Sequence, residues 1–288
     1  MDSNANKKHK DSVFSALFGT PEILRELYSA IAGIDIPEDA IVDINTLSDA
    51  LFMKQINDLS FTINDRIVVL IEHQSTINEN LPLRILMYIG RVYEKIVENQ
   101  KIYHRKLIKV PTPEFIVLYN GKEACPDHQE LRLSSAFMDT SELKQPGNHV
   151  LPLEVIVRVY NINHGCNPEI LERSETLNAY SFFIKKINDF KKHFSLDESL
   201  KSAVKYCIEH DVLKKFLEEH GSEVVNMLFD ELTTEEIAEF RYKEGLEDGR
   251  EEGREEKLRI ACNALTKGLA PEFVSEITGL SLEEIQTL

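Results

Sequence analysis

Two acidic residues and a glutamine, Asp58, Glu72 and Gln74, have types and a spacing that could bind a divalent metal ion. The four apolar residues 68–71 predict a strand that is buried on both faces, and Glu72, His73 and Gln74 follow at its end. An unpaired carboxylate at such a depth costs several kcal/mol, so Glu72 needs a partner. The carboxylates of Asp58 and Glu72, together with the backbone carbonyl of His73, form a hard oxygen site that suits Mg²⁺ or Mn²⁺.

The chemistry expected of this set is the hydrolysis of a phosphodiester bond. A bound divalent cation activates a water and neutralises the charge that builds on the phosphate. Gln74 could orient the attacking water or a phosphate oxygen by hydrogen bonding, although it lacks the positive charge of a lysine. On spacing alone, the commoner interpretation leaves Glu72 and Gln74 exposed beyond the strand and makes Asp58 the cap of a turn.

The loop between two predicted strands decides whether Asp58 and Glu72 can share an ion. Residues 58–63 alternate between polar and apolar, residues 66–74 follow after an Asn-Asp turn signal, and together they predict a β-hairpin. A two-residue loop would place Asp58 and Glu72 on opposite faces of the sheet. A three- or five-residue loop centred on Asp65, or one β-bulge, would place them on the same face.

Arg84 and Tyr88 are further candidates for the site. Residues 81–100 predict a long amphipathic helix, in which these two side chains are one turn apart on one face. They could point at a scissile phosphate or at Glu72, but a packing role for Tyr88 and a salt bridge for Arg84 explain them equally well. The alternation of the strand places His73 on the face opposite Glu72, where packing or hydrogen bonding is its expected role.

The remaining elements predict an α/β protein with a mixed central sheet flanked by helices. Strand, helix and strand follow one another after the hairpin, which indicates a crossover connection onto parallel strands. Thr20 and Pro21 predict an N-cap and a first helical residue within the helical segment 11–32. Further strands are predicted at 37–46, 51–56, 114–119 and 153–162.

An all-helical C-terminal part is predicted from Pro168 onward. The expected domains are an α/β core over 1–165, a helical extension packed on it over 166–240, a charged helix or linker with a repeated glycine over 241–257, and a small helical tail over 258–288. The Thr-Gly-Leu-Ser step at 278–281 has the length of a helix-turn-helix turn. Because Glu283 and Glu284 follow it without a Lys or Arg, phosphate contacts there would be poor, and an interaction or capping helix pair is the preferred interpretation.

Composition limits the class of protein. The chain has 288 residues, 42% of them hydrophobic, which suffices for a large core. It contains no transmembrane run and no apolar region of a secretory signal near its N-terminus. Its four cysteines form no CxxC pair, so a reducing cytoplasm is the expected location.

The net charge of −16 argues against a protein that covers itself in nucleic acid by charge alone. The acidity is uneven, however. Residues 1–109 contain 13 Lys and Arg against 15 Asp and Glu, whereas residues 194–256 contain 8 against 19. A nucleic-acid partner therefore stays compatible with the N-terminal part.

Several stretches resemble the bacterial recombination-promoting nuclease family of the PD-(D/E)XK nuclease superfamily. They are, in order, KDSVFSALFGTPEIL, NDLSF, VVLIEHQST, LPLRILMYIGRVYE, PTPEFIVLYNG, LRLSSAF, VIVRVYNIN and ITGLSLEEI. The resemblance implies a restriction-endonuclease-like core and Mg²⁺- or Mn²⁺-dependent cleavage of DNA, linked to recombination or transposition. It implies Asp58 and Glu72 as metal ligands and Gln74 in the place of the superfamily's lysine. Asp11 falls in the family's N-terminal motif and is an additional candidate acid.

Two classes of function compete at this point. The first is a Mg²⁺-dependent DNA endonuclease. The second is a non-catalytic protein that keeps the nuclease fold as an interaction scaffold and self-associates through its C-terminal helices. A further hypothesis is that the acidic tail regulates a nuclease by covering its basic surface.

Overall fold

The computed structural model describes residues 12–44, 58–97, 101–138 and 151–286. The strand predicted at 51–56 and the candidate acid Asp11 lie outside these ranges. The chain divides into two compact units, Met1–Phe229 and Asp230–Leu288. Each unit is described by itself below.

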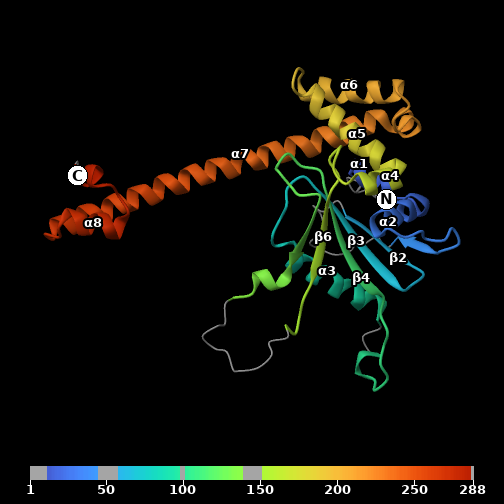
Figure 1. Ribbon diagram of the computed structural model, residues 1–288, viewed down its shortest axis with the longest axis horizontal. Coiled ribbons are helices and arrows are strands. Elements are labelled where there is room, and N and C mark those ends of the chain that lie inside the picture. The colour runs from blue at the N-terminus through green and yellow to red at the C-terminus, as the bar shows by residue number, and fades with distance from the viewer. Residues whose placement is uncertain (1–11, 45–57, 98–100, 139–150, 287–288) are drawn as a thin grey trace, which may run out of the picture. The chain divides into compact units, whose positions relative to one another are not determined.

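A six-stranded mixed sheet forms the centre of the first unit, as far as the chain is described (Figure 1). The strand order is β1-β2-β3-β4-β6-β5, with parallel pairing of β3 to β4 and of β4 to β6, and antiparallel pairing elsewhere. The predicted mixed sheet is confirmed. The strands are β1 Val42–Ile44, β2 Asp58–Ile63, β3 Ile67–Gln74, β4 Thr112–Tyr119, β5 His128–Arg132 and β6 Ile156–Asn161.

Helices flank this sheet, and the C-terminal part is helical, as predicted. The α-helices are α1 Val13–Phe18, α2 Pro21–Ala32, α3 Leu81–Ile96, α4 Pro168–Arg173, α5 Glu175–Phe190, α6 Leu196–Glu209, α7 Lys214–Thr266, α8 Pro271–Thr278 and α9 Leu282–Gln286. Short 3₁₀ turns are η1 Lys101–Tyr103 and η2 Leu133–Ala136. The described helices contain no segment long and apolar enough to cross a membrane.

The edge strand β5 was not predicted. Its sequence, HQELR, has one aliphatic residue and alternates between exposed and half-buried positions. It pairs with β6 on one side and ends the sheet. An edge strand needs little apolar surface because its ladder hydrogen bonds fix it, and charged residues suit an exposed edge. A strand of this kind leaves almost no signal in hydrophobic periodicity.

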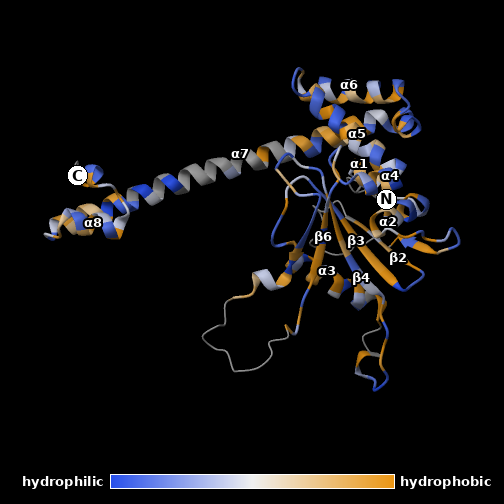
Figure 2. Cartoon of the chain, viewed as in Figure 1, coloured by the Kyte–Doolittle hydropathy of each residue, from blue (hydrophilic) through white to orange (hydrophobic). Residues whose placement is uncertain are grey.

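The central strand β3 is buried on both faces, as its apolar run predicts. Val68 and Leu70 pack into a core beneath α3, with Ile85 of that helix and Val117 of β4. On the other face, helices α1, α2 and α5 cover the sheet, and Tyr28 of α2 meets a β2 ring edge-on there. Figure 2 shows hydrophobic residues along the central strands and α3. The two faces of β3 therefore lie in different cores.

Helix α2 begins where the sequence predicts. The Thr20 hydroxyl accepts a hydrogen bond from the Ile23 backbone N–H, and Pro21 is the first helical residue of α2. Glu26 of α2 then holds the start of α5, because its carboxylate accepts hydrogen bonds from the Ser174 hydroxyl at 2.6 Å and the Thr176 backbone N–H at 3.1 Å. A carboxylate at a helix N-terminus satisfies N–H groups that lack intrahelical partners. This contact fixes the helical extension on the α/β core.

The second unit consists of α7 from Asp230 onward, with α8 and α9. Gly279 ends α8 in the left-handed conformation, with φ +68°, which suits a residue without a side chain. A small core joins the three helices, formed by Ala261, Ala264, Val274, Leu280 and Ile285.

His73 anchors the face of β3 that lies under α1 and α5. Its ring stacks on Phe14 with centroids 4.9 Å apart, and its Nε2 lies 3.3 Å from the Tyr180 hydroxyl. The side chain thus packs and forms a hydrogen bond on the face opposite Glu72, as the alternation predicts. Burial lowers the pKa of His73 from 6.5 to about 4.

His73→Phe is expected to reduce the pH dependence of stability. Between pH 4 and 6.5 the unfolded chain binds a proton that the folded chain does not, so the stability is complete above about pH 6.5 and falls as the pH is lowered through this window. Phenylalanine keeps the stacking and cannot titrate. Urea denaturation at several pH values measures the free energy of unfolding. Between pH 6.5 and pH 4 this free energy should fall by about 3 kcal/mol less in His73→Phe than in the wild type.

Tyr180→Phe is the matched control, because it removes the hydroxyl near His73 and leaves the imidazole buried. Its pH dependence should remain that of the wild type. Equal profiles for His73→Phe and the wild type would contradict the burial of a neutral imidazole.

Candidate acidic site at the end of strand β3

The turn between β2 and β3 sets the register of the site. The loop has three residues, Asn64, Asp65 and Arg66, and Ile63 pairs with Ile67 across it. Asn64 and Asp65 adopt left-handed backbone conformations, with φ 49° and 52°, which asparagine and aspartate tolerate better than most residues. The Arg66 N–H donates to the Ile63 carbonyl at 3.0 Å and closes the loop.

The three-residue loop brings Asp58 opposite Glu72. These two residues are direct partners in the antiparallel ladder. Residues that oppose one another in a ladder share a face of the sheet, with Cβ atoms about 5 Å apart. The observed pairing of β2 with β3 is therefore the register that a shared ion requires. The side chain of Asp58 itself lies outside the described part of the structure.

Glu72 is a buried carboxylate with two partners. It is 1% exposed. Its Oε1 lies 3.5 Å from Nη2 of Arg84, and its Oε2 accepts a hydrogen bond from Nε2 of Gln74. Burial raises the pKa of the Glu72 carboxyl above its ordinary value, and the charge of Arg84 and the hydrogen bond from Gln74 oppose this rise. The exposed alternative for Glu72 is thus wrong.

Helix α3 supplies the cation beside Glu72. Arg84 donates from its Nε to the Tyr88 hydroxyl at 3.3 Å, and the Tyr88 side chain is 8% exposed. Arg84 therefore points at Glu72 and Tyr88 holds its guanidinium, which is one of the two arrangements that the sequence left open. The Arg84 side chain keeps 31% of its surface exposed, so it faces both the carboxylate and solvent.

The end of β3 carries oxygen donors of the kind that a divalent cation binds. The Oε1 of Gln74 is buried and has no hydrogen-bond partner among the described residues, although buried acceptors are usually paired. The amide nitrogen of the same side chain donates to the Glu72 carboxylate, and the ladder places Asp58 opposite Glu72. Among the described side chains, no three His, Cys, Asp or Glu residues gather as metal ligands; Asp11 and the Asp58 side chain fall outside that set.

The end of β4 holds the end of β3 in place, a contact that was not predicted from the sequence. The Asn120 N–H donates to the Gln74 carbonyl at 2.9 Å. A Cβ at Gly121 would lie 1.8 Å from the Ser75 carbonyl oxygen and 2.5 Å from the Tyr119 hydroxyl. Only glycine allows this approach of the two backbones. The Asn-Gly pair after a buried strand was the available signal.

Gly121→Ala is expected to destabilise the protein by at least about 2 kcal/mol, because backbone must move to admit the methyl group. Chemical denaturation measures this change. Gly90→Ala is the matched control: nothing lies within 4 Å of a Cβ there, in the middle of α3. It should stabilise the chain by about 0.5–1 kcal/mol. Equal stabilities for the two variants would contradict the close approach at Gly121.

Glu72→Gln is expected to stabilise the protein at pH 7 in the absence of divalent cations, by on the order of 1 kcal/mol. The raised pKa means that the folded wild type binds its proton more tightly than the unfolded chain, so wild-type stability falls as the pH rises above 4.5. The advantage of the variant should therefore disappear towards pH 4.5. Urea denaturation in EDTA at several pH values measures the difference.

Glu130→Gln is the control for Glu72→Gln. Glu130 is exposed on β5 and pairs with Arg132, so its replacement should change stability by less than about 0.5 kcal/mol. A loss of stability in Glu72→Gln at pH 7 would show that the attraction of Arg84 outweighs the cost of burial.

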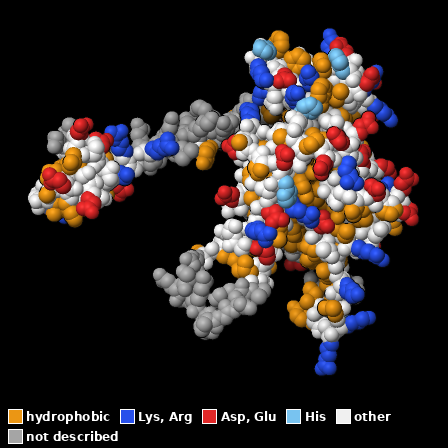
Figure 3. Space-filling view, in the orientation of Figure 1, with side chains coloured by type: hydrophobic (Ala, Val, Ile, Leu, Met, Phe, Trp, Pro, Cys, Tyr) orange, Lys and Arg blue, Asp and Glu red, His pale blue; other side chains and the backbone are white. Residues whose placement is uncertain are grey.

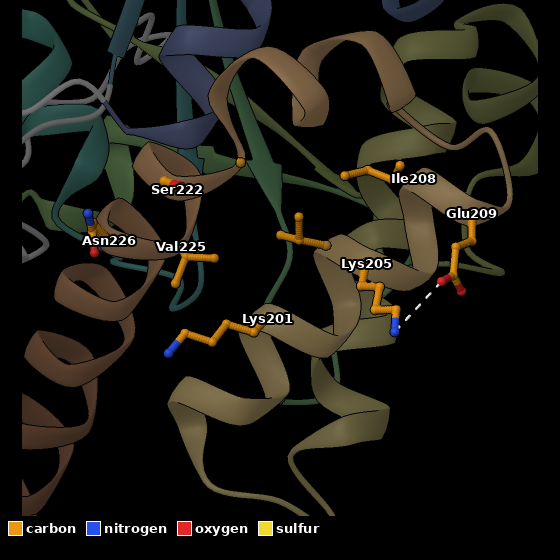
Figure 4. Close-up of a pocket in the computed structure, with 9 residues that line it drawn as sticks. Lys201, Lys205, Ile208, Glu209, Ser222, Val225 and Asn226 are labelled. Carbon is orange, nitrogen blue, oxygen red and sulfur yellow. Dashed lines mark ion pairs between the residues drawn. The ribbon is translucent and has the colours of Figure 1, made fainter.

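A groove of about 580 Å³ between α6 and α7 lies apart from these residues (Figure 4). Val204, Ile208 and Val225 give it an apolar lining. Its rim lysines are neutralised: Lys205 pairs with Glu209 at 3.9 Å, and Lys201 pairs with a carboxylate of its own helix. None of the residues predicted to perform chemistry lines it.

The fold and the site define a class: a mixed α/β protein with a buried acidic site at the end of a central strand, followed by helices. The family model described as the Rpn/YhgA-like nuclease family, C-terminal HTH domain, matches residues 254–288. This match supports the assignment of the chain to the recombination-promoting nuclease family and confirms the resemblance seen in the sequence. Among the curated proteins and the solved structures, none matches the chain.

The match also bears on the small helical tail. It names the segment of α8 and α9 an HTH domain, so the helix-turn-helix architecture, which the sequence ranked second, is the supported one. The acidic character noted for α9 persists: the Glu284 carboxylate accepts hydrogen bonds from the Ser281 N–H and hydroxyl and pairs with Arg254 at 3.0 Å. A cap role thus explains this acid.

Proposed function

We propose that the protein is a Mg²⁺-dependent DNA endonuclease that hydrolyses phosphodiester bonds, with Mn²⁺ as an alternative ion. Asp58, Glu72 and the backbone carbonyl of His73 would hold the ion. The observation that carries this proposal is the direct opposition of Asp58 and Glu72 in the β2–β3 ladder, with Glu72 buried in its strand. A buried acid that the folded register places opposite a second acid favours a shared cation over an accidental arrangement.

Gln74 has a defined part in this proposal. The Glu72 carboxylate has no hydrogen to donate, so it must accept, and the amide nitrogen of Gln74 faces it. The amide oxygen is then the atom left without a described partner. It can accept a hydrogen bond from the attacking water and so orient its lone pair towards the phosphorus. Gln74 therefore serves the water rather than a phosphate oxygen.

Arg84 supplies the positive charge that Gln74 lacks. Its guanidinium contacts Glu72 and is partly open to solvent, so it can meet a phosphate oxygen without leaving the carboxylate. The bound ion would supply Lewis acidity and an activated water. Tyr88 keeps Arg84 in place through its hydroxyl and through its ring, whose centroid lies 5.9 Å from the Arg84 guanidinium carbon.

DNA is the proposed partner, and recombination or transposition is the proposed setting. The nuclease family of the matched segment and its HTH description support this choice. A helix-turn-helix commonly brings a helix to the major groove. Self-association through the C-terminal helices remains part of the scaffold alternative, for which the described contacts offer no specific support.

Nicking of supercoiled plasmid in Mg²⁺ tests the proposal. The wild-type chain should nick, and Asp58→Asn and Glu72→Gln should each reduce the rate at least about a hundredfold, because each removes a charged ligand of the proposed ion. Glu130→Gln, an exposed carboxylate on the edge strand, should retain full activity. Mn²⁺ titrations followed by electron paramagnetic resonance should show weaker binding to both site variants.

Equal nicking by the wild type and both site variants would trace the activity to another site or to a contaminant. A wild type that binds no Mn²⁺ and never nicks would overturn the enzyme proposal in favour of the scaffold.

A further inference from the structure

A short basic segment stands out against the acidic chain. Residues 101–110, KIYHRKLIKV, are called the basic arm here. The wider stretch 99–113 contains four Lys and Arg and no Asp or Glu, in a chain of net charge −16. The arm connects the end of α3 to the start of β4. Such a concentration of one sign of charge marks a surface for an anionic partner.

Three cations of the basic arm have side chains that the structure describes. Arg105, Lys106 and Lys109 are exposed, and none of them forms an ion pair with a described residue. Figure 1 shows this segment projecting past the end of the sheet where β4 begins, and Figure 3 shows basic and hydrophobic side chains covering it. Each charge is thus available for a partner from solution.

Large apolar side chains are exposed beside these cations. Tyr103 is 90% exposed and Leu107 is 83% exposed. Exposed apolar groups of this size, gathered in a few residues, commonly mark a contact surface. A tyrosine ring can pack on sugars or bases while the flanking cations meet phosphates.

The base of the arm is firmly held although its tip projects. The Thr112 N–H donates to the Arg66 carbonyl at 2.8 Å, and the Tyr93 hydroxyl donates to the Pro111 carbonyl at 2.8 Å. These bonds tie residues 111 and 112, which follow the arm directly, to α3 and to the start of β3. The arm is therefore presented from the same rigid sheet that carries Glu72.

We propose that the basic arm binds the sugar-phosphate backbone of duplex DNA that flanks the site of cleavage, through Arg105, Lys106 and Lys109. The inference rests on the proposed nuclease function and specifies which surface of an acidic protein takes up its polyanionic substrate. Charge complementarity favours DNA. The exposed residues Lys201, Lys205 and Lys214 of α6 and α7 differ from the cations of the arm, because each of them pairs with a carboxylate.

The sheet sets the distance between the arm and the acidic site. The arm meets β3 at its start, and Glu72 lies five residues further along that strand, which is roughly 17 Å at the rise of a β-strand. A duplex must therefore extend at least about five base pairs beyond the cleaved bond to reach the arm. The arm should accordingly affect DNA binding and leave the chemical step unchanged.

The test compares the full chain with the triple variant Arg105→Ala, Lys106→Ala, Lys109→Ala. Both also carry Glu72→Gln, so that the DNA stays intact. Binding of a fluorescent 30-base-pair duplex is measured by anisotropy over a series of KCl concentrations. The variant should bind at least about tenfold more weakly at 100 mM KCl, and its slope of log K against log salt should be shallower by about 3, one unit for each lost phosphate contact.

The triple variant Lys201→Ala, Lys205→Ala, Lys214→Ala is the matched control. It removes the same charge from exposed but paired positions, so its affinity and salt slope should equal those of the parent. Unchanged affinity and slope in the arm variant would overturn the proposal. If the arm variant lost binding to phosphatidylserine vesicles and kept DNA binding, the proposal would be overturned in favour of a membrane surface as the partner. Circular dichroism verifies that the variants are folded.

The nicking assay separates this inference from the proposed function. For this assay the arm variant is made without Glu72→Gln. If it nicks at the wild-type rate and with an unchanged KM, the proposed role of the arm is refuted and the nuclease proposal is unaffected. Arm-dependent DNA binding in a chain that never nicks would support the arm and refute the nuclease. A raised KM with an unchanged kcat is the result expected if both hold.

Discussion

The buried carboxylate of Glu72 is the constraint on which the site depends. It lies at the end of a strand that is covered on both faces, and burial favours its protonated form. Arg84 from helix α3 and Gln74 from the same strand oppose that preference. Because removing one partner of a buried charge is costly, the end of β3 and the start of α3 must keep their relative positions. The geometry of the site and the stability of the core are therefore coupled.

The backbone of the β2–β3 loop and of the strand ends determines where the side chains of the site meet. Two left-handed residues, Asn64 and Asp65, lengthen the hairpin loop to three residues and thereby set the register of β2 against β3. At the opposite end of β3, Gly121 lets the β4 backbone approach the Ser75 carbonyl. His73 fixes the other face against Phe14 and Tyr180. The strand end is thus held from both faces and from its neighbouring strand.

The charge distribution gives the protein separate surfaces. The acidic residues concentrate in the C-terminal part, while the basic arm projects from the α/β core without a described ion pair. In the helix-turn-helix tail, Glu284 caps α9 and pairs with Arg254. An overall negative charge reduces nonspecific association with nucleic acid, so binding would depend on local cations. In the proposed nuclease, local cations at the arm would bring DNA to the acidic site at the other end of β3.

The sequence by itself determined the elements with strong periodicity or clear boundaries. The alternation of residues 58–63, the apolar run 68–71 and the Thr20-Pro21 helix start each depend on neighbours in the chain, so they were predicted correctly. The opposition of Asp58 and Glu72 was decided only by the tertiary structure, because one residue in the loop length reverses the face of every side chain. The contact of Arg84 with Glu72, the edge strand β5 and the close approach at Gly121 likewise depend on contacts between separate segments of the chain, which no local pattern records.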